Sequence, residues 1–182
     1  MPGAGKSQVT DLLVEGHGFE RIYFGQVVLD ELAGQGVRPS PAAERSAREE
    51  LRRAEGMDVM AARSLPNIRE ALSRSSSVCI DGLYSLAEWR LLARETGVIT
   101  LAVHAPRWLR KARLAGRPLR PLLGAELDAR DLAEVDELQK AEPIALADAH
   151  LVNDATVDDL RRGVERVLEQ LAEIDAARLQ TL

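Results

Sequence analysis

The sequence predicts an α/β protein built on a parallel sheet, and three observations lead to this fold class. Short apolar runs alternate with helical segments along the chain, which is typical of parallel strands joined by helices. At least one of these runs is almost continuously apolar, as expected for a strand covered on both faces. The chain also opens on a glycine-containing stretch that leads straight into an apolar helix face. We predict that residues 1–182 form a single domain.

The composition excludes several classes of protein. The chain has 182 residues, of which 46% are hydrophobic and 29% charged, and its net charge is −5. A negative balance argues against binding a nucleic-acid polymer, and the absence of eighteen consecutive apolar residues argues against a membrane span. Cys79 is the only cysteine, so neither an internal disulfide nor a cysteine zinc cluster is expected. Because no secretory signal is recognisable either, we expect a cytoplasmic protein.

The opening stretch, MPGAGKS, matches the end of the phosphate-binding pattern G-x-x-x-x-G-K-[ST]. Gly5, Lys6 and Ser7 fill its last three positions, and Gly3 lets backbone N–H groups close on phosphate oxygens. The helix that follows would point its positive end at the same phosphate. Lys6 would reach the β and γ phosphates, and the Ser7 hydroxyl would hold Mg²⁺. The alternative is a flexible tail, against which the apolar helix face that follows argues.

The pattern extends beyond the beginning of this sequence. Its first glycine would lie one residue before Met1, and such a loop normally follows a buried strand. Either the leading strand of the sheet has been lost, or the start of the sequence was assigned too late, or the loop is degenerate.

The first half of the chain is predicted to be mostly helical. In order, we expect a helix over 5–15, a strand over 19–24, and helices over 26–32, 42–54 and 57–72. Gly16 and Gly18 end the first helix, since glycine adopts positive φ readily. Ser40 as a cap and Pro41 in the first turn favour a helix start at that point. Pro66 is expected to bend the last of these helices.

The second half alternates more regularly between strands and helices. In order, we expect a strand over 78–82, a helix over 86–95, a strand over 98–105, a helix over 106–115, helical residues over 127–146, a strand over 149–152 and a C-terminal helix. Thr156 caps that last helix, with Asp159 as its capping-box partner. Apolar residues from Val157 to Ile174 recur at helical spacing, so this helix is scaffold rather than site.

Two stretches in this half carry candidate site residues. Asp81 and Gly82 end an apolar run, and a buried parallel strand would deliver Asp81 to the ligand crevice. The alternative is a turn in which Asp81 caps the next helix. The second stretch is cationic and is interrupted by glycine and proline, and it contains Arg107, Arg110, Lys111, Arg113, Arg117, Arg120 and Arg130. It is either a lid that closes over phosphates or a solvated surface loop.

Together with the residues at 147–154, ADAHLVND, these features resemble the nucleoside monophosphate kinase and dephospho-CoA kinase group of P-loop kinases, and in particular its adenylate-kinase-like members. The resemblance covers nearly the whole chain apart from the leading strand. It implies a three-layer fold around a five-stranded parallel sheet. It also implies a helical insert that binds the acceptor at about 25–72 and a lid at about 113–131.

The resemblance further implies roles for single residues. ATP would lie on the loop, with Asn153 beside the adenine, and Asp81 would lie near Mg²⁺ or the acceptor. The ATP-binding residues would be Gly3, Ala4, Gly5, Lys6, Ser7 and Asn153. The catalytic residues would be Lys6, Asp81, Arg113, Arg117 and Arg130. Ser7 and Asp81 would hold Mg²⁺.

One position departs from the pattern of similar proteins, which carry Gly-Asp and then an arginine after the second strand. Here the same place reads Gly25-Gln26-Val27-Val28-Leu29, and neither an uncharged Gln26 nor Leu29 can take those roles. The leading prediction is an ATP-dependent phosphotransferase whose acceptor is a nucleotide-like small molecule, a nucleoside monophosphate or a dephospho-CoA-like compound. The alternatives are a nucleotide-binding regulatory module without kinase activity, and a structural domain that binds no nucleotide. The sequence leaves open the acceptor, the choice of ATP over GTP, and the oligomeric state.

Overall fold

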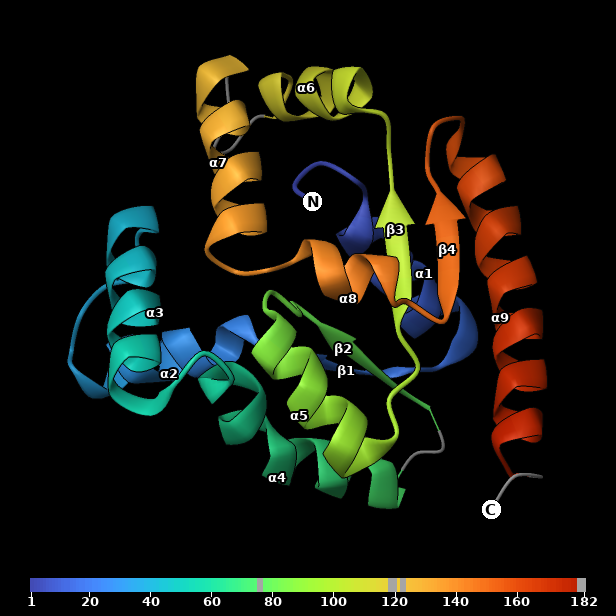
Figure 1. Ribbon diagram of the computed structural model, residues 1–182, viewed down its shortest axis with the longest axis horizontal. Coiled ribbons are helices and arrows are strands. Elements are labelled where there is room, and N and C mark those ends of the chain that lie inside the picture. The colour runs from blue at the N-terminus through green and yellow to red at the C-terminus, as the bar shows by residue number, and fades with distance from the viewer. Residues whose placement is uncertain (75–76, 118–120, 122–123, 180–182) are drawn as a thin grey trace. The chain divides into compact units, whose positions relative to one another are not determined.

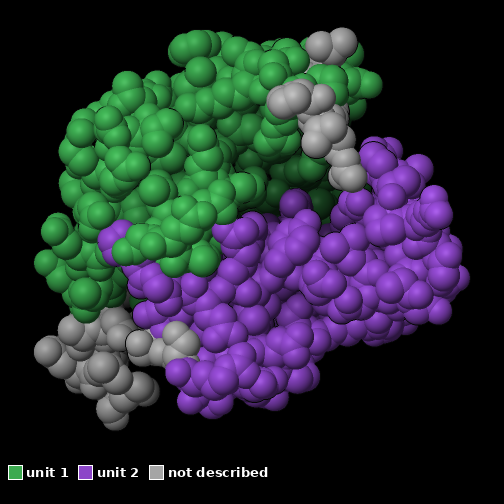
Figure 2. Space-filling view, turned by 180° about the vertical axis from the view of Figure 1, so that it is seen from behind, with its two compact units in different colours: residues 1–16, 99–182 green, residues 17–98 purple. Residues whose placement is uncertain are grey.

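The computed structural model describes residues 1–74, 77–117, 121 and 124–179 (Figure 1). The chain divides into two compact units, which are coloured separately in Figure 2. Unit 1 comprises Met1–Gly16 and Ile99–Leu182, and unit 2 comprises His17–Val98. Each unit is described by itself. The predicted extents of the single domain (1–182), of the acceptor insert (about 25–72) and of the lid (about 113–131) stay predictions. Arg120 lies outside the described residues.

Unit 2 packs helices around a short parallel sheet. Its elements are β1 (Glu20–Tyr23), α2 (Gly25–Gly34), α3 (Pro41–Glu55), α4 (Val59–Arg74), β2 (Val78–Asp81) and α5 (Leu86–Thr96). The two strands are parallel, with Glu20 opposite Val78 and Tyr23 opposite Asp81. The core of this unit comprises Phe24, Val27, Val28, Leu32, Ala47, Leu51, Val59, Met60, Ala61, Ile68, Leu91 and Leu92.

Local capping explains where two helices of unit 2 begin. The Ser40 hydroxyl accepts a hydrogen bond from the backbone N–H of Ala43, 3.2 Å away, which confirms the predicted start of α3. Ser85 caps α5 and forms a capping box with Glu88. The alternative role considered for Asp81, as the cap of this helix, is therefore wrong. Pro66 lies within α4, which continues on both sides of it.

Unit 1 contains the other parallel strand pair. Its elements are α1 (Lys6–His17), β3 (Leu101–His104), α6 (Arg107–Ala115), α7 (Gly124–Asp136), α8 (Ala141–Ala145), β4 (Ala149–Val152) and α9 (Val157–Leu179). Helix α9 runs alongside β4 (Figure 1). Its Gly163 allows this close approach, because a Cβ there would collide with the side chain of Leu151. Thr156 and Asp159 form the predicted capping box, with each backbone N–H bonded to the other's side chain.

The four described strands form two parallel sheets of two strands each, β1 with β2 and β3 with β4. The predicted class, α/β with parallel pairing, is confirmed, and the fold is consistent with that of P-loop kinases. The resemblance implies one five-stranded sheet, and the described residues contain one strand pair in each unit.

Three predicted boundaries are wrong. The helical stretch predicted over 127–146 is two helices, because Gln139 adopts a left-handed φ of 50° and the N–H of Lys140 turns back to the carbonyl of Glu134. Phe24, predicted to end a strand, instead has the helical φ and ψ of −63° and −27° and leads into α2. The strand predicted over 98–105 is limited to Leu101–His104, where it pairs with β4.

Among the described residues, none of the helices combines the length and apolar character that crossing a membrane requires.

Candidate phosphate-binding site

The opening loop of unit 1 depends on its two glycines. Gly3 has a φ of 75° and Gly5 a φ of 96°, values that side-chain-bearing residues rarely adopt. A Cβ on Gly3 would lie 3.0 Å from the side chain of Leu114 on α6. On Gly5 it would overlap the side-chain amide of Asn153, which follows β4. Both the backbone conformation and the close neighbours therefore require glycine at these positions of the motif.

Two side chains hold the loop by its carbonyl groups. Arg110 Nη1 donates to the carbonyl oxygen of Pro2 at 3.1 Å, and Asn153 Nδ2 donates to that of Ala4 at 3.0 Å. All peptide bonds in the described chain are trans, and a trans peptide directs its N–H opposite to its carbonyl. The N–H groups of the two loop glycines therefore point away from the side chains that hold the loop. Amide groups directed in this way form the donors of an anion nest.

The start of α1 adds to these donors. The helix begins at Lys6, directly after the loop, so its first-turn N–H groups have no acceptor within the helix and its positive end lies at the loop. Lys6 Nζ donates to the carbonyl oxygen of Met1 at 3.0 Å, which keeps the ammonium at the loop. Ser7 is exposed in the first turn, and its hydroxyl is the type of oxygen ligand that Mg²⁺ accepts. These residues fit a nucleotide phosphate with its magnesium ion.

Asn153 is a structural partner of the loop. It is only 3% exposed, and its backbone N–H donates to the carbonyl of His104 at 2.7 Å. Arg113 donates to its backbone carbonyl at 3.0 Å and to Oδ1 at 3.2 Å. These bonds orient the side chain so that its Nδ2 meets the loop. The structure thus brings Asn153 and Arg113 together, while the contact of Asn153 with adenine stays a prediction.

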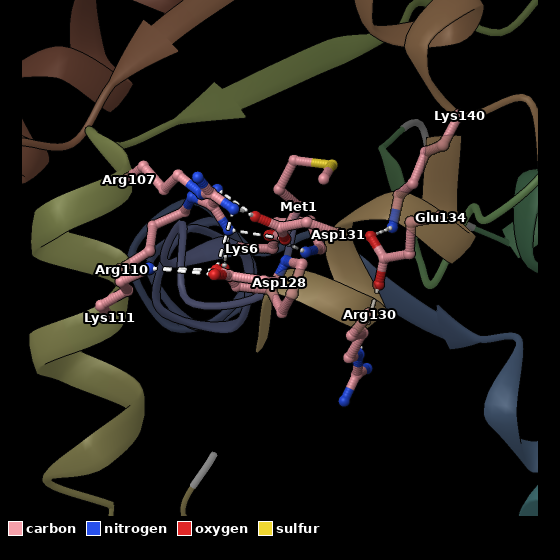
Figure 3. Close-up of polar contacts among 11 residues, drawn as sticks. Met1, Lys6, Arg107, Arg110, Lys111, Asp128, Arg130, Asp131, Glu134 and Lys140 are labelled. Atoms are coloured by element: carbon pink, nitrogen blue, oxygen red, sulfur yellow. Dashed lines mark hydrogen bonds and ion pairs between the residues drawn. The ribbon is translucent and has the colours of Figure 1, made fainter. Parts of the chain in front are cut away.

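Helices α6 and α7 are joined by a buried ion pair (Figure 3). Arg110 Nη1 and Nη2 donate to the two carboxylate oxygens of Asp131 at 2.9 and 2.6 Å, and both side chains are nearly buried. The same guanidinium binds Pro2, so Asp131 fixes the group that fixes the loop. Sequence reasoning named Arg110 only as part of the cationic segment and assigned no role to Asp131. The only signal was that Arg110 lies four residues before the buried Leu114, on the same helix face.

A second buried ion pair lies within the segment that follows. Lys140 Nζ donates to Glu134 Oε2 at 2.8 Å, and their side chains are 5% and 6% exposed. Arg130, which was predicted to clamp phosphate, lies on the outer side of this pair with its Nε 3.5 Å from Glu134 Oε1 (Figure 3). The left-handed turn at Gln139 lets the chain return, so that Lys140 meets Glu134.

Burial and two lysine charges disfavour a positive charge on the Met1 amino group beside the loop. Burial lowers the pKa of the Met1 amino group to about 5, and the charges of Lys6 and Lys140 lower it further, against the opposing effect of Glu134. Burial disfavours a charge of either sign, whereas the two lysine charges favour an anion at this position.

Comparison with known proteins identifies the family. Residues 1–114 match a family model described as an AAA domain. A UPF0200 protein from Thermococcus sibiricus is 33% identical over 176 residues, which cover 94% of this chain and 92% of the relative. UPF0200 proteins from Methanothrix thermoacetophila and Aeropyrum pernix are 34% and 35% identical, and the alignments cover 94% and 84% of those relatives and 94% and 88% of this chain. The chain belongs to the UPF0200 family of P-loop kinase-like proteins.

The other residues singled out in the sequence of this UPF0200 chain lie on several different elements. Asp81 ends β2 in unit 2, so its part at the loop of unit 1 stays a prediction. Arg117 is exposed just after α6. Gln26 is exposed on α2, where its amide donates to Asp30 at 2.8 Å, and Leu29 is half-buried on the same helix. The UPF0200 chain therefore has neither a base nor a phosphate ligand at positions 26 and 29.

The buried Glu134 carboxylate predicts acid sensitivity of this UPF0200 protein. Burial raises its pKa, but the charge and hydrogen bond of Lys140, together with the charges of the Met1 amino group and Arg130, outweigh this, so that the net pKa lies below the ordinary value of 4.5. A carboxyl whose pKa is lowered by folding contributes stability above its unfolded pKa, and that contribution is lost as the pH falls through the lowered value. We expect the free energy of unfolding to decrease below about pH 4.5. Urea unfolding of the parent chain and of Glu134→Gln at several pH values measures this decrease. The same dependence of the free energy of unfolding on pH in both chains would contradict the prediction.

Proposed function

We propose that the protein transfers the γ-phosphoryl group of ATP to a nucleotide-like small molecule, a nucleoside monophosphate or a dephospho-CoA-like compound. The observation that carries the proposal is the geometry of the loop. Arg110 and Asn153 hold its carbonyl groups, so that its glycine N–H groups point away from these two side chains. Helix α1 begins directly after the loop, at Lys6. Membership of a P-loop kinase-like family supports nucleotide binding. The names of the relatives state no activity, so the reaction is our proposal.

Phosphoryl transfer leaves little covalent chemistry to the protein, which mainly positions the reactants and stabilises charge. MgATP would supply the phosphoryl group. The loop amides would hold its phosphates, Lys6 would neutralise the charge on the β and γ groups, and the Ser7 hydroxyl would bind the metal. These roles use the residues that the structure places together.

The remaining roles would belong to four further residues. Arg113, Arg117 and Arg130 would stabilise charge on the group in transfer, as guanidinium groups do for phosphate. Arg113 would do so from a position fixed by its bonds to Asn153. Asp81 would orient the acceptor hydroxyl or a metal-bound water.

A second function, nucleotide binding without transfer, is favoured by one observation. The residues at 26 and 29, where similar kinases carry an acidic side chain and an arginine, are a glutamine bonded to Asp30 and a leucine. A regulatory module needs neither group, because it only has to bind nucleotide and change state.

The test combines calorimetric titration of MgATP with a transfer assay over nucleoside monophosphates and dephospho-CoA. Lys6→Ala should weaken MgATP binding by about 10- to 100-fold, since a hydrogen bond to a charged group contributes about 1.5–3 kcal/mol. Lys111→Ala is the matched control, because Lys111 contacts Asp128 at 3.0 Å rather than the loop. Undiminished transfer in Lys6→Ala would contradict the proposal. Binding without transfer to any acceptor would favour the regulatory module, and no binding in the parent chain would favour the structural domain.

A further inference from the structure

Two histidines form a hydrogen bond between the neighbouring strands β3 and β4. His104 Nε2 and His150 Nδ1 are 3.0 Å apart, and His150 pairs with Ala102, two positions before His104, so both histidines lie on the same face of the sheet. Leu151 points to the other face, where Gly163 of α9 meets it. The two ring planes differ by 17° and their centroids are 5.2 Å apart. With the facing nitrogens only 3.0 Å apart, these values place the rings edge to edge, so that one ring donates its N–H to the other.

This pair can take up one proton and keep its hydrogen bond. In the neutral pair, one facing nitrogen carries a hydrogen and the other accepts it. A proton added to the far nitrogen of the donor ring makes that ring a cation, and a charge-assisted hydrogen bond is shorter and stronger. A second added proton would place a hydrogen on both facing nitrogens and break the bond. The pair is therefore suited to hold a single additional proton, in the pH range where histidine titrates.

Positive charges face the pair from the neighbouring elements. Burial lowers the pKa of His104, and the charges of His150 on β4 and of the Met1 amino group in the opening loop lower it further. Lys6 at the start of α1 and Arg113 on α6 are further cations, bonded to the carbonyls of Met1 and Asn153. No carboxylate in the described part of the chain contributes to the pKa of His104. The pair therefore lacks a negative charge that would favour its proton.

The opening loop is where such a charge would be supplied. The backbone carbonyl of His104 accepts the N–H of Asn153 at 2.7 Å, and Asn153 Nδ2 donates to the carbonyl of Ala4 in the loop at 3.0 Å. Because the Met1 amino group acts on His104, charges at the loop reach this ring. A polyphosphate bound to the loop would bring several negative charges to the same place and favour the protonated pair.

We propose that His104 and His150 take up one shared proton when a nucleoside triphosphate binds, so that the chain binds the nucleotide more tightly as the pH falls. The inference rests on the proposed function, because it requires a polyphosphate on the loop. A bound anion raises the pKa of His104, so the complex holds more protons than the free chain at a pH between the two values. Because the coupling is reciprocal, the affinity for the nucleotide increases as the pH falls through that range. A rise of about one unit corresponds to a gain in affinity of up to about tenfold.

The experiment follows the ring ¹⁵N signals of both histidines in the full chain from about pH 8 to pH 5, with and without saturating MgATP. His104→Gln and His150→Gln assign the signals. We expect both rings to change with one common midpoint, since strongly coupled groups titrate as a pair. The midpoint should lie below the ordinary histidine value of 6.5 without nucleotide, and MgATP should raise it by about half a unit or more. The exposed His17, at the other end of α1, is the control whose midpoint MgATP should leave unchanged.

Calorimetry in two buffers of different ionisation enthalpy measures the protons taken up with MgATP. The parent chain should take up more protons per bound nucleotide than His104→Gln does. The difference between the two chains removes the protons that the nucleotide itself and the Met1 amino group take up. His17→Gln is the matched variant and should behave like the parent chain.

The results separate this inference from the proposed function. A common midpoint that MgATP does not raise would overturn the inference, and so would two independent midpoints. The ring titration uses the parent chain, so this outcome does not depend on how well the variants fold. Phosphoryl transfer that depends on Lys6 would then leave the proposed function standing. Conversely, a raised midpoint in a chain that transfers no phosphoryl group would contradict the proposed transfer while the proton uptake remains, and a chain that binds no MgATP would overturn both.

Discussion

Replacing Gly5 with alanine is expected to remove measurable MgATP binding. An alanine at a φ of 96° is strained by roughly 1–2 kcal/mol, as left-handed conformations are for residues with a Cβ. The new methyl group would also overlap Asn153 Nδ2, so this amide would leave the carbonyl of Ala4. A buried carbonyl without a donor costs about 1–3 kcal/mol more. Together these effects correspond to a loss of affinity of roughly a hundredfold or more, which calorimetric titration with MgATP measures.

Gly18→Ala provides the matched control. Gly18 has a φ of 69°, but a Cβ there would meet no atom within 4 Å, so the substitution introduces strain without a collision. It should lower stability modestly and leave the affinity for MgATP unchanged. Parental affinity in Gly5→Ala would contradict the assignment of this loop as a phosphate site. Equal losses of affinity in the two variants would show that general destabilisation, not the loop, is responsible.

The second large effect is expected from Asp131→Ala. This substitution leaves the buried guanidinium of Arg110 without its carboxylate, and breaking a buried ion pair in this way costs about 3–5 kcal/mol. Urea unfolding followed by circular dichroism should show a midpoint well below that of the parent chain. Asp128→Ala is the control, because Asp128 forms exposed pairs with Arg107 and Lys111 that contribute little.

A double variant separates stability from support of the loop. In Arg110→Met with Asp131→Leu, apolar side chains replace both charges, and such exchanges of a buried pair are often neutral or stabilising. We expect it to recover most of the stability lost in Asp131→Ala. It should still bind MgATP more weakly than the parent chain, since Pro2 has lost the donor to its carbonyl. Parental affinity in the double variant would show that Arg110 stabilises the helices without positioning the loop.

Much of the local structure could be predicted because short-range signals decide it. The cap at Ser40 and the capping box of Thr156 and Asp159 involve residues three positions apart, so the sequence contains both partners of each hydrogen bond. The parallel class likewise follows from the alternation of elements.

The predictions failed where tertiary contacts decide the backbone conformation. Gln139 breaks a helix without glycine or proline at that position, in a turn after which Lys140 pairs with Glu134 in the interior. Phe24 is apolar enough for a strand, yet it leads into α2 and lies in the core of unit 2. Propensity is a weak signal, and it is overridden by the burial of Phe24 itself and, next to the exposed Gln139, by the burial of the Lys140–Glu134 pair.

The same distinction applies to the site. The sequence by itself determined the candidate phosphate loop, because its glycines, Lys6 and Ser7 lie within five positions and the roles proposed for them depend on backbone geometry within a few residues. Only the tertiary structure decided what supports that loop. Asn153 reaches Ala4 across 149 positions, and Arg110 reaches Asp131 across 21. No periodic pattern connects residues so far apart, because folding brings their helices and strands together to bury apolar surface, and the polar partners meet as a consequence.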